Sequence, residues 1–137
     1  MAGKGRAADF GLLILRLGVG GMFIVHGAPK LLSGPEGWAR LGDAMGNLGV
    51  HAYPAFWGFM AGFAEGIGGL MLAVGLLTRP FAAMMFFTMV VASTQHLMSG
   101  DGLKQASHAI ELGFVFFSLI LTGPGPLSLD GKWRGKA

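Results

Sequence analysis

The feature that most constrains this chain is an apolar segment, residues 55–77, in which Glu65 is the one formally charged side chain. A helix over these 23 residues is long enough to cross a hydrocarbon core of about 30 Å. Gly58, Gly62 and Gly69 share one helical face with Glu65. Small residues at this spacing let a second helix approach closely, and an acid inside a membrane needs a partner. The segment therefore predicts a membrane-spanning helix whose glycine face, with Glu65, packs against a neighbouring helix.

Composition points to a membrane protein. The chain has 137 residues, of which 53% are hydrophobic and 12% charged, and this favours one domain, residues 1–137, with the bilayer as its solvent. The net charge of +3 comes from basic residues scattered singly at helix ends, which argues against nucleic-acid binding. The absence of cysteine excludes thiol-disulfide chemistry and cysteine-ligated clusters. The expected fold is all-α, an integral membrane four-helix transmembrane bundle.

Hydrophobic runs and their breakers predict spans at about residues 10–27, 55–77, 81–98 and 107–122. Arg16 interrupts the first run, so we interpret it as a retained span and not a signal peptide. Pro29 is expected to end that helix, and residues 78–80 to form the turn before the third. Residues 36–48 form either an amphipathic helix on the membrane surface or a loop, and the sequence leaves both open.

The basic residues predict orientation. Six of them would lie on the side of the termini and three on the other side. This excess places both termini in the cytoplasm, and the protein in the cytoplasmic (inner) membrane. The first group is Lys4, Arg6, Arg79, Lys132, Arg134 and Lys136, and the second is Lys30, Arg40 and Lys104.

Arg16 and Glu65 are the first candidate pair. Both are expected near the middle of their helices on faces that contain glycines, so a charge-assisted hydrogen bond between them satisfies both. Such a pair either forms the floor of a binding site or only locks two helices together.

A second group of polar residues lies near the outer ends of the predicted helices and is expected to converge with Arg16 and Glu65 on one outward-facing pocket. A quinone that takes up two electrons also takes up two protons, so its site needs titratable groups near its carbonyl oxygens. We expect His26, His96 and Glu111 to act as proton donors or acceptors, and Arg16, Lys30, Glu65 and His108 to bind the cofactor. The alternative is that each histidine only contacts lipid headgroups and water.

Metal or haem binding is a less favoured hypothesis than quinone binding. Histidines from two helices are able to hold a b-type haem, but no metal-ligand spacing such as HExxH or paired Glu-x-x-His occurs, so we expect no metal site. The methionines of residues 81–98 are expected to fill the core, because the thioether packs into irregular gaps.

Several short stretches, in this order and spacing, resemble the DoxX family of membrane proteins over nearly the whole chain. They are Leu15-Arg16-Leu17-Gly18, His26-Gly27, Pro29-Lys30-Leu31, Glu65-Gly66, Gly68-Gly69-Leu70, Gly75-Leu76-Leu77-Thr78-Arg79, His96, Glu111-Leu112, Thr122-Gly123-Pro124-Gly125 and Ser128-Leu129-Asp130. The resemblance implies a four-helix protein of the bacterial or archaeal cytoplasmic membrane, similar to the small membrane subunits of thiosulfate:quinone oxidoreductase. It also implies site roles for Arg16, His26, Lys30, Glu65, His96 and Glu111, whereas His108 is outside the family pattern.

The expected function is therefore that of a membrane subunit of a quinone-linked oxidoreductase, and whether it catalyses alone is left open. Its expected partners are membrane lipid, a quinone, a soluble or membrane oxidoreductase subunit, and further copies of itself. The rivals are a non-enzymatic scaffold that recruits a soluble redox enzyme, and, less favoured with only four spans, a small transporter or channel.

Overall fold

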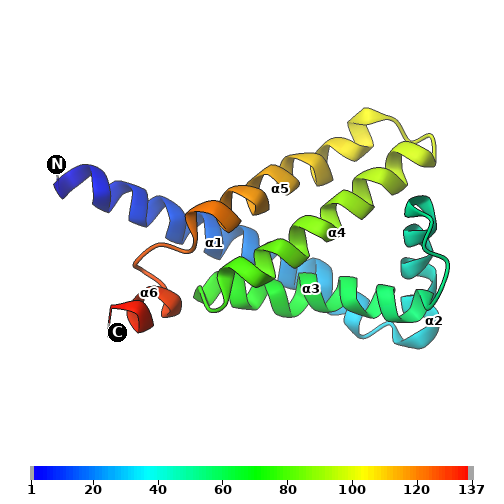
Figure 1. Cartoon of the computed structure of the whole chain (residues 1–137), viewed down its shortest axis with the longest axis horizontal. Helices are drawn as coiled ribbons and strands as arrows, with labels where there is room; N and C mark the ends of the chain where they lie inside the picture. Colours follow the sequence, from blue (N-terminus) through cyan, green and yellow to red (C-terminus); the bar gives the residue numbers. More distant parts are fainter. Residues whose placement is uncertain (1, 136–137) are drawn as a thin grey trace.

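The computed structural model describes residues 2–135, and this part of the chain is helical and contains no strand. Four helices are long and apolar enough to cross a membrane, which confirms the predicted fold class (Figure 1). In chain order the elements are α1 (Ala2–Leu31), α2 (Gly34–Gly42), the 3₁₀ helix η1 (Asp43–Leu48), α3 (Pro54–Val74), α4 (Thr78–Met98), α5 (Leu103–Thr122) and α6 (Leu129–Arg134).

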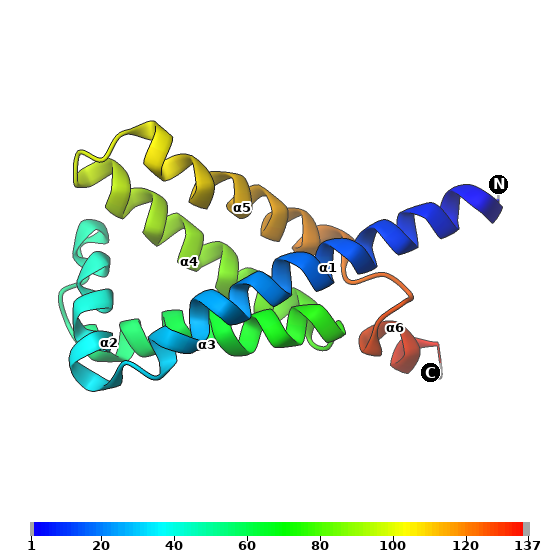
Figure 2. The same cartoon turned by 180° about the vertical axis from the view of Figure 1, so that it is seen from behind.

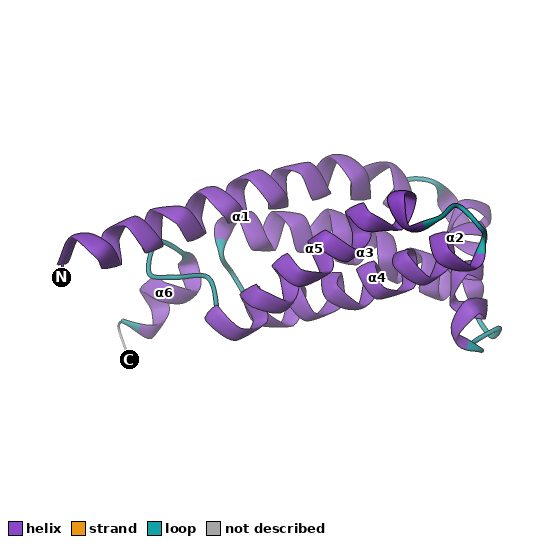
Figure 3. Cartoon of the chain, turned by 90° about the horizontal axis from the view of Figure 1, so that it is seen from above, coloured by secondary structure: helices purple, strands orange, loops and turns teal. Residues whose placement is uncertain are grey.

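The four long helices form two pairs that diverge toward one end of the molecule. α1 packs along α3 and α4 along α5, and the pairs separate toward the end where α2 and η1 lie (Figures 1 and 2). Both ends of the described chain, with α6, lie at the opposite end (Figure 3). We call these the α2 end and the α6 end.

Glycines set the contact between α1 and α3. A Cβ built on Gly20 would lie 2.5 Å from the carbonyl oxygen of Gly69, and one built on Gly27 would overlap the backbone at Gly66. A Cβ built on Gly58 would likewise overlap the backbone of Trp38, in α2. The indole Nε1 of Trp38 donates to the carbonyls of Lys30, at 3.0 Å, and Leu31. The glycine face of α3 is thus a contact face, as its sequence predicts.

The core is built from apolar side chains of all four long helices. Phe23 of α1 meets Phe116 of α5 edge to face, with ring centroids 5.1 Å apart. Met85 and Met89 of α4 are buried in the same cluster, as predicted, whereas Met84 is half-buried and Met98 is exposed, so only two of the four methionines fill the core.

Several element boundaries differ from the sequence-based expectation. α1 does not end at Pro29 but continues to Leu31, because a proline in the last turn removes only the hydrogen bond to the carbonyl four residues before it. The turn before α4 is not residues 78–80: Gly75 ends α3 with φ +72°, and Thr78 already begins α4. Pro80 is accommodated in that first turn, where its missing N–H is not needed.

Residues 36–48 are helical and do not form a loop. They belong to two short elements, α2 and η1, which meet at Gly42 and Asp43 instead of forming one continuous helix. Gly42 is buried against the backbone of Pro54 and Gly58, so α2 crosses directly over the first turns of α3.

Candidate functional site

Lys30 is the partner of Glu65. Its ammonium nitrogen lies 2.7 Å from Glu65 Oε2, and the two side chains are 36% and 4% exposed. α1 and α3 run antiparallel with Gly27 against Gly66, so the last turn of α1 brings Lys30 beside Gly62 and Glu65. A cation reaching from a helix end thereby satisfies an acid deep in α3.

The prediction that Arg16 pairs with Glu65 is wrong. Because Gly20 lies against Gly69, Arg16 reaches the last turn of α3 instead, where Nη1 donates to the carbonyl of Ala73 at 3.0 Å. Nη2 donates to the carbonyl of Leu127, in the segment before α6. The side chain is fully buried. These acceptors include carbonyls left free at the end of a helix, where the helix dipole also favours a cation, so Arg16 holds the α6 end together.

Asp130 completes this connection at the α6 end. Its carboxylate accepts the backbone N–H groups of Leu77 and Thr78, both at 3.0 Å, and its own N–H donates to the carbonyl of Gly75 at 2.9 Å. Burial raises the pKa of Asp130, but these backbone hydrogen bonds, the Thr78 side chain and the positive charge of Arg134 together outweigh it, so the pKa lies below its ordinary value. The carboxylate therefore caps the start of α4.

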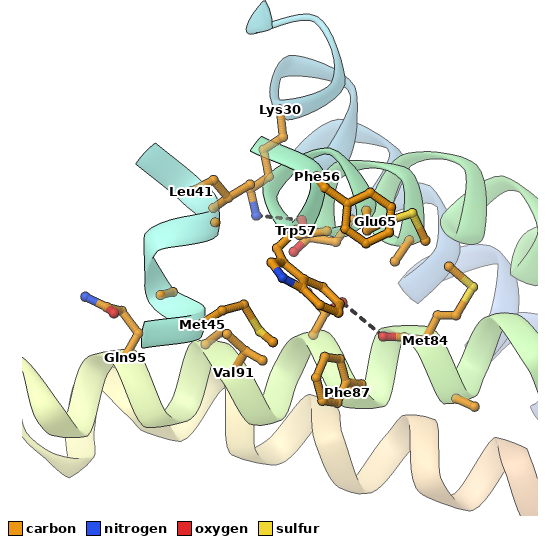
Figure 4. Close-up of a pocket in the computed structure, with 18 of the residues that line it drawn as sticks. Lys30, Leu41, Met45, Phe56, Trp57, Glu65, Met84, Phe87, Val91 and Gln95 are labelled. Atoms are coloured by element: carbon orange, nitrogen blue, oxygen red, sulfur yellow. Dashed lines mark hydrogen bonds and ion pairs between the residues drawn. The ribbon is translucent and has the colours of Figure 1, made fainter. Parts of the chain in front are cut away.

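A pocket of about 670 Å³ lies between α3 and α4, next to the Lys30–Glu65 pair. Most of its wall is apolar, and Figure 4 shows Trp57 of α3 and Phe87 of α4 lying within it. The wall also includes Phe56, Met60, Ala61 and Ala64 of α3, Ala83, Met84, Thr88, Val91 and Ala92 of α4, and Leu41, Gly42, Ala44 and Met45 of the α2 and η1 segment.

The polar lining of this pocket comes from a few groups. Lys30 and Glu65 contribute their ion pair, and Gln95 and His96 lie near the last turn of α4. Gln95 Oε1 accepts a hydrogen bond from Asn47 of η1, which ties the end of α4 to the segment that crosses the α2 end. His96 Nδ1 lies 2.9 Å from Asp101 Oδ2, so its ring is oriented by a carboxylate.

The structure gathers only part of the predicted site. Lys30, Glu65 and His96 line the pocket, whereas Arg16 lies at the α6 end. His26, His108 and Glu111 are exposed and outside the pocket, and within residues 2–135 their side chains make no hydrogen bond or ion pair. The expected convergence of all these residues on one pocket is therefore wrong, and the roles of the individual residues stay predictions. In the same residues no group of three or more metal-ligating side chains is arranged around a common point.

Sequence reasoning missed Trp57, Phe87 and Gln95. Met84, Thr88, Val91 and Gln95 recur at spacings of four, three and four, which places them on one face of α4. This face changes from apolar methionine to polar glutamine toward the end of α4, and that change in polarity could have predicted this wall of the pocket from the sequence.

The fold and the site together define a small multi-pass membrane protein with a lysine–glutamate pair beside an apolar pocket inside its helical bundle. The DoxX family profile matches residues 11–97, which include both members of the pair. The chain belongs to the DoxX family.

Three curated relatives cover most of the chain. It is 31% identical to "Inner membrane protein YphA" of Escherichia coli (strain K12), over 93% of this chain and 97% of that protein. It is 29% identical to "Putative oxidoreductase CatD" of Bacillus subtilis (strain 168), over 91% and 88%, and 28% identical to an uncharacterized protein of Haemophilus influenzae, over 91% and 92%. No solved structure matches the chain. The family, the four apolar helices and the inner-membrane relative place the protein in the cell membrane.

Proposed function

We propose that this chain is a membrane subunit of a quinone-linked oxidoreductase and that the pocket between α3 and α4 binds the quinone ring. The observation that carries the proposal is an apolar pocket of about 670 Å³ with a lysine–glutamate ion pair in its wall. The similarity to "Putative oxidoreductase CatD" supports a redox association.

The lining fits a quinone in shape and polarity. Trp57 and Phe87 offer aromatic faces for a flat ring, and the methionine and alanine side chains around them suit an apolar tail. The Lys30 ammonium carries three N–H donors and uses one of them on Glu65, so further donors are available to a carbonyl oxygen. His96 supplies a second donor further along α4.

In this proposal the protein positions the ring and handles protons. A bound quinone supplies two-electron, two-proton chemistry, and its electrons come from a partner oxidoreductase subunit. The Lys30–Glu65 pair holds a proton at Nζ beside the pocket, and the Asp101 carboxylate orients the His96 ring that lines it. With both termini in the cytoplasm, as the basic residues predict, the pocket opens toward the outer side of the membrane.

The test is solvent extraction of protein purified in mild detergent, with chromatography for quinone and an absorption spectrum for haem. We expect stoichiometric quinone in the wild type, and its loss in Lys30→Met and His96→Ala. His26→Gln is the matched control, because His26 is an exposed histidine outside the pocket, and it should retain the quinone.

Several results would count against the proposal. They are a wild-type sample that neither contains quinone nor binds it when it is added, retention of quinone in both pocket variants, or a haem spectrum. Recovery of a soluble redox enzyme with wild type and His96→Ala alike, with no quinone in either, would favour the scaffold.

A further inference from the structure

A row of polar side chains runs along α5. Lys104, His108, Glu111, Val115, Ser118 and Thr122 follow one another at spacings of four, three, four, three and four. Alternating spacings of four and three are the pattern by which two helices pack in a left-handed pair. Five of the six residues are polar, although α5 is apolar enough to span a membrane. We call these six residues the α5 seam.

The α5 seam points away from the bundle. The buried residues of α5, among them Ala109, Gly113 and Phe116, lie on the other side of the helix and contact α4 and α1. Every seam residue is exposed except Val115, which is half-buried. Ser118 donates only within its own helix, to the carbonyl of Phe114, so no other element of residues 2–135 covers the seam.

Glu111 makes this exposure costly in a membrane. It lies eight residues into α5, about 12 Å along the helix from Leu103, and so inside a hydrocarbon core of about 30 Å. Ionisable side chains at such depth face a helix or a water-filled cavity, because contact with lipid chains costs several kcal/mol. The α5 seam is therefore a surface to be covered by another helix.

We propose that α5 of a second copy of this chain covers the seam, with a two-fold axis along the membrane normal. Two copies inserted in the same orientation place their α5 helices parallel and at the same depth. His108 and Glu111 are three residues apart, about 4.5 Å along the axis, so His108 of each copy reaches Glu111 of the other.

Charge complementarity favours a second copy over a different protein. The seam carries both a carboxylate and an imidazole, so it is complementary to itself, and symmetry forms the contact twice. Ser118 and Thr122 are small enough for the two helices to approach closely toward the α6 end, and the exposed Phe114 borders the seam with apolar surface.

The chain has no cysteine, so single cysteines report contacts directly. We expect oxidation of membranes containing Ser118→Cys to give a disulfide-linked dimer. Phe117→Cys is the matched control, since it is 47% exposed at nearly the same depth but lies off the seam, and it should stay monomeric. Three results would overturn the proposal. They are the absence of a dimer with Ser118→Cys, equal amounts of dimer with both variants, and a cross-link between the cysteine variant and a different protein.

A second measurement tests the contact itself. Single-molecule photobleaching in bilayers over a range of protein densities gives the dimer dissociation constant. We expect Glu111→Ala to raise this constant about tenfold, because two interhelical polar contacts are lost per dimer. Ile14→Ala, at an exposed apolar position of α1, should leave it unchanged. A wild-type protein that stays monomeric at every density, or equal constants for Glu111→Ala and wild type, would refute a second copy at this seam.

Discussion

Lys30 and Arg16 belong to the same inward face of α1, and each binds partners of a different kind. Lys30 pairs with a carboxylate, whereas Arg16 donates to backbone carbonyls at the end of α3 and near α6. Glu65 depends on Lys30, because its carboxyl is buried and Lys30 supplies its ion pair. Removing the lysine leaves a buried acid that must be either charged without a partner or protonated.

Lys30→Met should therefore destabilise the protein by about 2–3 kcal/mol, below the 3–5 kcal/mol typical of fully buried pairs because Lys30 is 36% exposed. The double variant Lys30→Met with Glu65→Gln should regain part of this loss, since it removes the unpaired charge. Denaturant unfolding in detergent, followed by tryptophan fluorescence, measures both. A double variant that is no more stable than Lys30→Met would contradict this account.

The Asp130 cap should make stability depend on pH in the acid range. Its pKa in the folded protein lies below the ordinary value of 3.8, so the contribution of the carboxylate is fully present above that pH and is lost as pH falls through the folded pKa. We expect wild type to unfold at a higher temperature than Asp130→Asn at pH 7, and the difference to shrink below about pH 4. A difference that does not change between pH 7 and pH 3 would contradict the capping role.

At the scale of elements, the contact between α1 and α3 depends on glycines that touch backbone. Gly27→Ala should destabilise the bundle by about 2 kcal/mol or more, because a Cβ there overlaps the backbone at Gly66 and no flexible side chain is available to move. Gly18→Ala is the control on the same helix: outside its own stretch of helix backbone nothing lies within 4 Å of its added Cβ, and alanine favours the helix. Thermal unfolding of the purified variants distinguishes them, and equal losses for both would show that the glycines do not set this contact.

The sequence predicts the helices and their glycine faces but not their register. Counting from expected helix ends places Arg16 and Glu65 at one depth. In the structure α1 begins earlier and continues past Pro29, and Gly20 meets Gly69, so Arg16 reaches Ala73 and Lys30 reaches Glu65. Periodicity defines which face of a helix is buried, whereas the axial offset between two antiparallel helices depends on side-chain contacts that one sequence does not reveal.

The sequence likewise predicts only some residues of the candidate site. Lys30, Glu65 and His96 are polar residues in apolar segments, and this is why the sequence singles them out. His26, His108 and Glu111 give the same signal, but their side chains face outward, and polarity alone does not distinguish a pocket from a seam between helices. The aromatic walls at Trp57 and Phe87 give no separate signal, since apolar residues occur on every face of these helices.

For the whole molecule, the arrangement of its ends predicts an orientation. Both ends of the described chain and the turn between α3 and α4 lie at the α6 end, which carries most of the described basic residues, and we expect that end to face the cytoplasm. In intact cells Ser99→Cys should react with a membrane-impermeant maleimide, whereas Trp133→Cys should react only after permeabilisation. The reverse labelling pattern would invert the topology and place the pocket toward the cytoplasm.

The bonds that Arg16 and Asp130 make also impose an order on synthesis. Leu127 and Asp130 are translated after all four long helices, so the Leu127 carbonyl that Arg16 contacts and the carboxylate that caps α4 arrive when these helices are already made. Until then the nascent protein holds a buried cation with fewer acceptors and an uncapped helix start. A chain truncated before Leu127 lacks both contacts, and we expect it to unfold more readily than the full chain.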